Sequence, residues 1–278
     1  MMNVDEFIRL ALEEDLGDGD HTSLSTIPEG KSGAAQLLAK QQGILAGVDV
    51  ARKVFKAVDP DTALEVYLED GTAIKAGDVV FRVSGKAISL LSAERLALNF
   101  MQRMSGIATY THFLNSLMEG LHTKLLDTRK TTPNFRYFEK EAVRIGGGVN
   151  HRMGLYDMIM IKDNHVDFAG GIGNAIKATH QYLESKDKKL KIEIEVRNLK
   201  ELREVLETRG VDRIMLDNFS IADMTAAVEM VGGKYETEAS GMITEGTIRK
   251  VAETGVDFIS VGALTHQVKS LDLSLKAI

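Results

Sequence analysis

The chain has 278 residues, of which 44% are hydrophobic and 27% charged, and its formal net charge is −6. It contains no cysteine, which excludes a disulfide framework, a thiolate-bound zinc or iron–sulfur centre and a cysteine nucleophile. It has no run of about 18 apolar residues, and its acidic N-terminus lacks the build of a signal peptide, so we expect a cytoplasmic protein with no membrane partner.

The first hundred residues predict a small α+β unit. Apolar residues recur at helical spacing over residues 3–14, with Asn3 as a candidate N-cap. A helical pattern also covers residues 92–105 and resumes after Gly106 through Leu117. Between these helices, short strand-like runs are separated by Asp-Gly and Gly-Asp turns, and the clearest of them are residues 34–40, 64–68 and 79–83.

From residue 123 onwards, short apolar runs alternate with longer amphipathic ones. We predict strands at residues 124–126, 158–161, 191–196, 213–216, 235–239 and 257–261. We predict helices between them near residues 172–184, 199–208, 221–231 and 245–254. The candidate N-caps are Asn198 with Glu201, Ser220 with Asp223, and Thr244. Repeated strand–helix units imply parallel strands, and six of them favour a (β/α) barrel over an open doubly wound sheet.

Charged and small residues follow these strands at the point where each one ends. They are Arg129 and Lys130 after the first strand, Lys162 after the second, then Glu195, Asp217, Ser240, Gly241 and Gly262. In a barrel the carboxyl ends of the strands meet at one mouth. Arginine and lysine suit carboxylates and phosphates, paired carboxylates suit Mg²⁺, and glycine lets backbone amides approach a phosphate. The set predicts a small anionic substrate and a phosphorylated, metal-bound co-substrate.

A local reversal of charge supports the same interpretation. Residues 129–152 hold six lysines or arginines against two acids, a net +4 in a chain of net −6. An anion site and a solvated basic face both fit this count. Taken singly, the strand-end residues also have interpretations without a function: a surface charge, a solvent-facing Glu195, a helix-entry turn at Asp217, or a tight turn at Gly262. Their joint occurrence at successive strand ends favours a site.

Motifs of one known family run in order over nearly the whole chain. The most specific blocks are Gly-Gly-Gly-Val-Asn-His-Arg-Met-Gly-Leu at residues 146–155 and Ile-Lys-Asp-Asn-His at residues 161–165. Further matching blocks lie at residues 14–22, 94–99, 105–109, 127–131, 195–196, 216–218, 238–241 and 260–266. On these motifs the chain resembles the quinolinate phosphoribosyltransferases, also called carboxylating nicotinate-nucleotide pyrophosphorylases.

The resemblance implies a fold and an assembly. An N-terminal α/β sandwich domain over residues 1–108 would precede an incomplete, open TIM-like α/β barrel over residues 109–266. A tail of residues 267–278 would return to the first domain. The family forms homodimers or higher homo-oligomers, in which Arg95 would reach the substrate held by the neighbouring subunit.

The resemblance also implies an enzyme of de novo NAD biosynthesis. The phosphoribosyl group of 5-phosphoribosyl 1-pyrophosphate (PRPP) would pass to quinolinate with decarboxylation, giving nicotinate mononucleotide, pyrophosphate and CO₂. By similarity, the cations that meet quinolinate would be Arg129, His151, Arg152 and Lys162, with Arg95 in trans. Glu195 and Asp217 would hold Mg²⁺ and act in catalysis together with Lys130. Lys130 and His266 would contact phosphate or pyrophosphate, and the 5-phosphate would lie on Ser240, Gly241 and Gly262.

One position departs from the family pattern, and two other functions stay open. Where the family commonly has a second glycine after the Ser-Gly pair, this chain has Met242. A paralogue associated with molybdenum-transport operons would be expected to alter the cationic set. A non-catalytic nucleotide-binding protein would have less need for both Glu195 and Asp217. The acidic net charge argues against a nucleic-acid partner.

Overall fold

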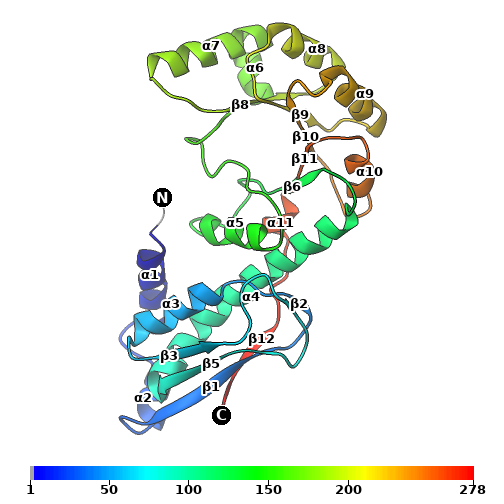
Figure 1. The fold of residues 1–278 in the computed structure, drawn as a ribbon. Helices are drawn as coiled ribbons and strands as arrows, with labels where there is room; N and C mark the ends of the chain where they lie inside the picture. Colours follow the sequence, from blue (N-terminus) through cyan, green and yellow to red (C-terminus); the bar gives the residue numbers. More distant parts are fainter. Residues whose placement is uncertain (1–2) are drawn as a thin grey trace. The chain divides into compact units, whose positions relative to one another are not determined.

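The computed structural model describes residues 3–278, which form two compact units (Figure 1). The first unit comprises the residues up to His112 together with Thr132–Gly147 and Gln267–Ile278. The second comprises Phe113–Thr131 and Gly148–His266. Within residues 3–278, no helix has both the length and the apolar character needed to cross a membrane.

The first unit is built on a four-stranded antiparallel sheet in the order β12 (Leu273–Ala277), β1 (Ser32–Ala39), β5 (Val79–Lys86) and β3 (Ala63–Val66). Helices α3 (Val48–Val58) and α4 (Ala87–Leu117) lie along one face of this sheet (Figure 1). Phe55 of α3 meets Phe81 of β5 edge-on, with ring centroids 6.1 Å apart. The remaining elements are α1 (Val4–Leu16), α2 (His21–Thr26), β2 (Gly43–Ile44), β4 (Ala73–Ile74) and α5 (Arg136–Ile145).

The predictions for this unit are confirmed in part. The first helix is present, and the Asn3 side chain caps it by accepting a hydrogen bond from Asp5 N. Helix α3 was not predicted, although its apolar residues have helical spacing. Helix α4 is continuous through Gly106, where a Cβ atom would lie 2.1 Å from the carbonyl oxygen of Lys269. Glycine is therefore required there because the returning C-terminal segment passes directly against the helix.

The second unit holds six parallel strands in the order β6-β11-β10-β9-β8-β7. Their bounds are β6 (Lys124–Leu126), β7 (Ile159–Ile161), β8 (Ile192–Val196), β9 (Arg213–Asp217), β10 (Glu236–Ser240) and β11 (Phe258–Ser260). The first strand pairs with the last, and each of the others pairs with its neighbour in sequence, but β6 and β7 do not pair with each other. The barrel is therefore open between β6 and β7, and the predicted fold class is confirmed.

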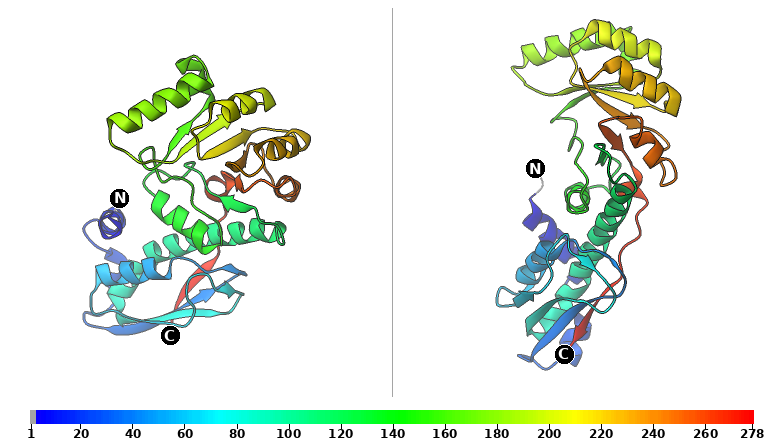
Figure 2. Two further views of the ribbon diagram at one scale, coloured as in Figure 1. Left: turned by 45° about the horizontal axis from the view of Figure 1, so that its top comes forward. Right: turned by 45° about the vertical axis from the view of Figure 1, so that its right-hand side comes forward.

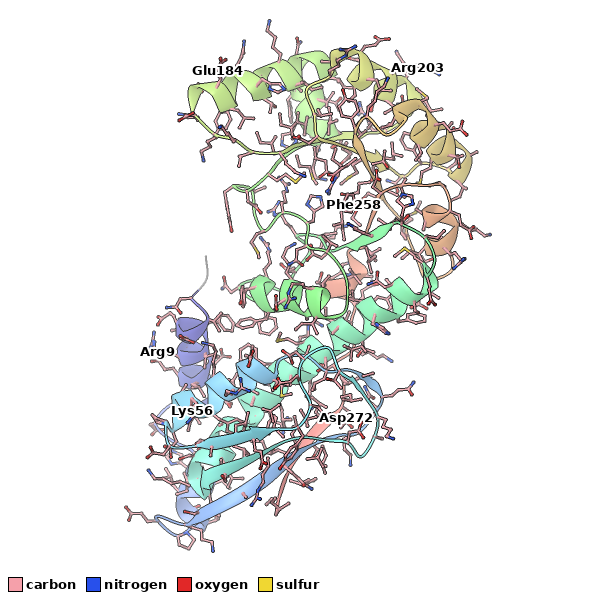
Figure 3. The ribbon with its side chains drawn as sticks, in the orientation of Figure 1. Arg9, Lys56, Glu184, Arg203, Phe258 and Asp272 are labelled. Carbon is pink, nitrogen blue, oxygen red and sulfur yellow. The ribbon has the colours of Figure 1, made fainter. Side chains whose placement is uncertain are left out.

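The helices of this unit lie on the outer side of the strands, as Figure 2 shows for α7, α8 and α9. They are α6 (Asp163–Ala169), α7 (Ile172–Ser185), α8 (Leu199–Thr208), α9 (Ile221–Val231), α10 (Ile248–Ala252) and α11 (Ala263–His266). In Figure 3, Glu184 and Arg203 mark these outer helices and Phe258 lies on the inner side of the strands. The outer face is apolar along β8, where Ile192, Ile194 and Val196 are buried.

The caps of two helices are as predicted and the third is wrong. Asn198 accepts hydrogen bonds from Lys200 N and Glu201 N, and Ser220 accepts one from Asp223 N. Thr244 does not cap α10, which begins four residues later at Ile248. Its carbonyl accepts from Thr247 N and Ile248 N, so Thr244 begins a turn before the helix.

At the open edge, the chain stays beside β6 for one further residue. Val149 forms an isolated parallel bridge with Leu126: its N–H donates to Leu125 O, and its carbonyl accepts from Asp127 N. The segment that follows reaches β7 without joining a strand. Residues 150–158 therefore lack the ladder of backbone hydrogen bonds that fixes the other strand ends.

Candidate active site at the barrel mouth

Two of the predicted small residues lie in a tight turn after β10. Gly241 has φ of +97°, and a Cβ atom there would lie 2.1 Å from the Oδ1 atom of Asn218. Asn218 is itself left-handed, donates its backbone N–H to Ser240 O, and donates its side-chain amide to Asp217 Oδ2 at 2.7 Å. Glycine is required at position 241 because the turns after β9 and β10 interlock.

The predicted phosphate-contacting residues Lys130, His266 and Gly262 come together after β6 and β11. A Cβ atom on Gly262 would meet Lys130 Cδ at 3.0 Å and His266 Nε2 at 3.1 Å. The hydroxyl of Thr265 donates to Lys130 O at 2.7 Å, which fixes the backbone next to the lysine side chain. Glycine at this position therefore lets the Lys130 and His266 side chains approach the backbone of the β11 turn.

Arg129 and Arg152, which lie more than twenty residues apart in sequence, act on each other across the open edge. Burial and the nearby Arg129 guanidinium lower the pKa of Arg152. Arg152 is half-buried, and its Nη1 atom donates to Met158 O at 3.2 Å. Two guanidinium groups that repel each other in a partly buried position are stabilised when a carboxylate or phosphate lies between them. This pair therefore indicates an anion site.

Lys162 and Glu195 form an ion pair at the ends of β7 and β8. The distance from Lys162 Nζ to Glu195 Oε2 is 3.0 Å, and the glutamate side chain is only 8% exposed. The interpretation of Glu195 as a solvent-facing residue of an alternating strand is therefore wrong, because the inner face of the strand is enclosed by the barrel. Asp217 ends the neighbouring strand β9 and is half-buried.

Beneath the mouth lies a buried charged cluster, formed by His151, Glu193, Arg213 and Glu238. His151 Nε2 lies 3.0 Å from Glu193 Oε2 and 3.4 Å from Glu238 Oε2. Arg213 Nη1 lies 3.1 Å from Glu238 Oε2, and its guanidinium lies 4.0 Å from the centre of the Phe258 ring. The three residues on strands were not predicted to have a role. Each lies two or four residues before a mouth residue on the same strand, a signal that was available in the period-2 pattern.

Comparisons with known proteins identify the family of the chain. The model of the quinolinate phosphoribosyl transferase N-terminal domain matches residues 20–105, and that of the C-terminal domain matches residues 107–276. The chain belongs to the quinolinate phosphoribosyltransferase family.

Individual relatives match over nearly the whole length of this chain. The chain is 46% identical to quinolinate phosphoribosyltransferase (decarboxylating) 2, mitochondrial, of Nicotiana glauca, over 98% of this chain and 81% of the relative. It is 42% identical to a probable nicotinate-nucleotide pyrophosphorylase (carboxylating) of Bacillus subtilis, over 94% of this chain and 89% of the relative. Among solved structures, NadC from Streptococcus pyogenes matches with a TM-score of 0.93 at 38% identity, covering 99% of this chain and 97% of that one.

Two residues that the family pattern singles out are exposed. Arg95 is exposed on α4 in the first unit. Met242, where the resemblance predicts a glycine, is left-handed with φ of +46° and is 87% exposed. A non-glycine residue in this conformation costs roughly 1–2 kcal/mol, so the turn keeps its glycine-like backbone at the expense of stability.

The buried cluster retains a proton that the same groups would release in water at neutral pH. Glu193 and Glu238 raise the pKa of His151 to about 9 against the opposing effect of burial. Burial and the adjacent Glu238 raise the pKa of Glu193. The backbone N–H of Arg152 donates to His151 Nδ1 at 2.6 Å and opposes protonation of that nitrogen. The retained proton therefore lies on the Nε2 side of the ring, toward the carboxyl groups.

This retained proton predicts a pH dependence of stability. The pKa of His151 is higher in the folded state than in the unfolded state, so the folded protein binds the proton more tightly. The contribution of this proton to the free energy of unfolding is therefore complete below the unfolded pKa of 6.5, and it is lost as pH rises through about 9. We expect the midpoint of urea unfolding to fall between pH 6.5 and pH 9, and Glu193→Gln to reduce that slope. A midpoint independent of pH over this interval in the unmodified protein would contradict the assignment.

Proposed function

We propose that this protein transfers the phosphoribosyl group of PRPP to quinolinate, with loss of CO₂, to give nicotinate mononucleotide and pyrophosphate. The arrangement that carries the proposal is that the Arg129 guanidinium lies close enough to the half-buried Arg152 to lower its pKa, and that Lys162 follows β7 at the same mouth. Quinolinate carries two adjacent carboxylates and requires several cations in one small space. The relatives of this protein are named for the same reaction.

The quinolinate end of the site consists of Arg129, Arg152 and Lys162, with His151 beside them. Each charge-assisted hydrogen bond contributes about 1.5–3 kcal/mol of net binding free energy. Lys162 is half-exposed at 48%, so its ammonium can turn from Glu195 toward an entering carboxylate. Repulsion within the cation set in the free protein becomes attraction to the dianion in the complex, which favours quinolinate over a monocarboxylate such as nicotinate.

The PRPP end consists of the carboxylates and the small residues. Glu195 and Asp217 present carboxylate oxygens from neighbouring strands, and hard oxygen donors beside a phosphate fit Mg²⁺. Bound there, Mg²⁺ would neutralise the pyrophosphate leaving group. Lys130 and His266 lie on either side of Gly262 and would add positive charge to the same phosphates. Ser240, Gly241 and Gly262 follow β10 and β11 at the same mouth, and their backbone amides would bind the 5-phosphate.

The chemistry then needs positioning more than proton transfer. The cations hold the quinolinate ring nitrogen near the anomeric carbon of PRPP, where the new N-glycosidic bond forms as pyrophosphate leaves. The ring nitrogen becomes positively charged in that step. Its charge stabilises the carbanion left at the adjacent ring carbon when CO₂ departs, so electrostatic preorganisation carries the reaction and no nucleophilic side chain is required.

The direct test is the appearance of nicotinate mononucleotide when purified protein is mixed with quinolinate, PRPP and Mg²⁺. No product under saturating substrates would overturn the proposal.

We propose the cytoplasm as the location of this protein; plant relatives are named as mitochondrial or chloroplastic.

We further propose that the protein forms a homodimer or higher homo-oligomer. Apolar side chains are exposed after the strand ends, with Phe168 at 92% and Met242 at 87%. Large apolar residues in water around a site favour a covering surface. A second subunit that covers this rim would bring its own exposed Arg95 to the quinolinate carboxylates.

Subunit mixing tests this arrangement. Arg95→Ala and Arg152→Ala are each expected to lose nearly all activity as pure proteins. If Arg95 acts in trans, each site of a mixed dimer uses Arg152 of one chain and Arg95 of the other chain. One of the two sites then carries both substitutions, and the other carries neither. After exchange of an equimolar mixture, we expect roughly a quarter of wild-type activity per site from statistical pairing. Activity of the mixture equal to the mean of the two pure variants would contradict the trans assignment.

A further inference from the structure

His151 contacts protein groups at both ring nitrogens and at its backbone: Nδ1 and the backbone N–H form hydrogen bonds, whereas Nε2 lies within ion-pair distance of the carboxylates without hydrogen-bond geometry. Its Nδ1 atom accepts from Arg152 N at 2.6 Å, and its Nε2 atom lies 3.0 Å from Glu193 Oε2. Its own backbone N–H donates to Asp127 Oδ1 at 2.8 Å. One residue thus joins the end of β6 to the buried carboxylates of β8 and β10, and it does so at the start of the segment that carries Arg152.

The carboxylates that hold this ring are costly to bury. Glu193 and Glu238 are 0% exposed, in a layer of the barrel that apolar side chains usually fill. Arg213 pairs with Glu238 at 3.1 Å and approaches Glu193 at 4.0 Å. Buried ion pairs add little net stability over apolar side chains of the same size, so stability alone does not account for the cluster.

A metal ion is a poor occupant of the same position. His151, Glu193 and Glu238 do present ligand atoms within 4.8 Å of one another. However, Arg213 places a permanent positive charge directly against both carboxylates, and the imidazole is already engaged through Nδ1. A second cation would be repelled there. These carboxylates pair instead with the His151 imidazole and the Arg213 guanidinium.

We propose that Glu193 and Glu238 are positioning residues of the quinolinate site, which act by holding His151 and, through its contact with the backbone of Arg152, the Arg152 guanidinium. The proposal rests on the proposed function. It explains how an arginine in a segment without strand pairing can be held in place, since residues 150–158 lack the backbone ladder of the other strand ends. The side chain of Arg152 then needs only its bond to Met158 O to complete its orientation.

The experiment compares three variants by steady-state kinetics with quinolinate and PRPP varied separately. Glu193→Leu removes the carboxylate that pairs with His151 and should raise KM for quinolinate about tenfold or more, the size of one misplaced charged hydrogen bond between Arg152 and the substrate. KM for PRPP and kcat should change by no more than about twofold. Glu193→Gln keeps an acceptor oxygen at the same place and should stay within about threefold of wild type. Glu236→Gln, which removes another partner of Arg213 without touching His151, is the matched control and should leave both KM values unchanged.

A double-mutant cycle separates positioning from a general structural effect. If Glu193 acts through Arg152, then Glu193→Leu has no further effect on KM for quinolinate in an Arg152→Ala background. Additive effects, or equal changes in both KM values, would overturn the proposal. If Glu193→Leu fails to fold, His151→Asn replaces it in the cycle, because asparagine keeps an acceptor for Arg152 N but cannot reach the carboxylates. A wild-type protein that does not turn over quinolinate would overturn the proposed function itself.

Discussion

Replacing Arg152 by alanine is expected to lower kcat/KM for quinolinate by about 10²-fold, while the protein stays folded. The expected loss corresponds to one or two charge-assisted hydrogen bonds at about 1.5–3 kcal/mol each. Arg152 is half-buried beside Arg129, so its removal also relieves repulsion in the free protein. Stability should therefore be unchanged or slightly raised, and KM for PRPP should stay near the wild-type value. Steady-state kinetics and thermal unfolding measure the two effects separately.

A neighbouring arginine supplies the control for this variant. Arg144 belongs to the same positively charged stretch of sequence, but it is exposed on α5 and paired with Glu141. Arg144→Ala removes an equal charge from an exposed ion pair, and exposed pairs contribute little. We expect its kinetics to match the wild type. Equal losses in both variants would mean that overall charge, rather than the Arg152 position, attracts the substrate.

Replacing Glu195 by glutamine is expected to lower kcat/KM for PRPP by about 10²–10³-fold, comparable to the loss of one preorganised electrostatic contact in other enzymes. The change removes one of two carboxylates proposed to hold Mg²⁺ and the partner of Lys162 at 3.0 Å. A neutral amide binds Mg²⁺ more weakly, so the Mg²⁺ concentration for half-maximal rate should rise. Initial rates over a Mg²⁺ titration give this value directly.

Glu201→Gln is the matched control for that experiment. Glu201 lies on α8 and pairs with Arg197 outside the barrel. Its loss should leave the Mg²⁺ dependence of the rate unchanged. If Glu195→Gln also leaves that dependence unchanged while lowering the rate, then Glu195 serves Lys162 alone and the proposed metal position is wrong.

The strands of the barrel could be predicted because their sequence signal is local. Each apolar run lies between a turn and an amphipathic helix, and the residues after each run belong to the mouth whatever the details of packing. Lys130, Gly262 and His266 were expected near phosphate, and the fold brings them together. Helix α3 was missed because its short apolar pattern lies among strand-like runs, where an eleven-residue window supports either structure.

The interior cluster could not be read from the strands alone. An alternating Glu-Ile-Glu-Val pattern indicates that the two glutamates share a face of the strand, but it does not indicate whether that face is exposed to solvent. Only the curvature of the sheet encloses Glu193 and Glu195 together, one in the interior and one at the mouth. The partners of Glu193 come from β9, β10 and the loop at His151, so their meeting depends on tertiary contacts that no single segment specifies.

We propose that the cationic mouth selects a dianion and that the reaction releases CO₂. The most direct measurement mixes the purified protein with PRPP, Mg²⁺ and quinolinate labelled in the carboxyl group next to the ring nitrogen, with nicotinate in a parallel reaction. We predict one labelled CO₂ for each pyrophosphate formed from quinolinate, and no turnover of nicotinate. Turnover of nicotinate without quinolinate turnover, or pyrophosphate formation from quinolinate without CO₂, would contradict the account.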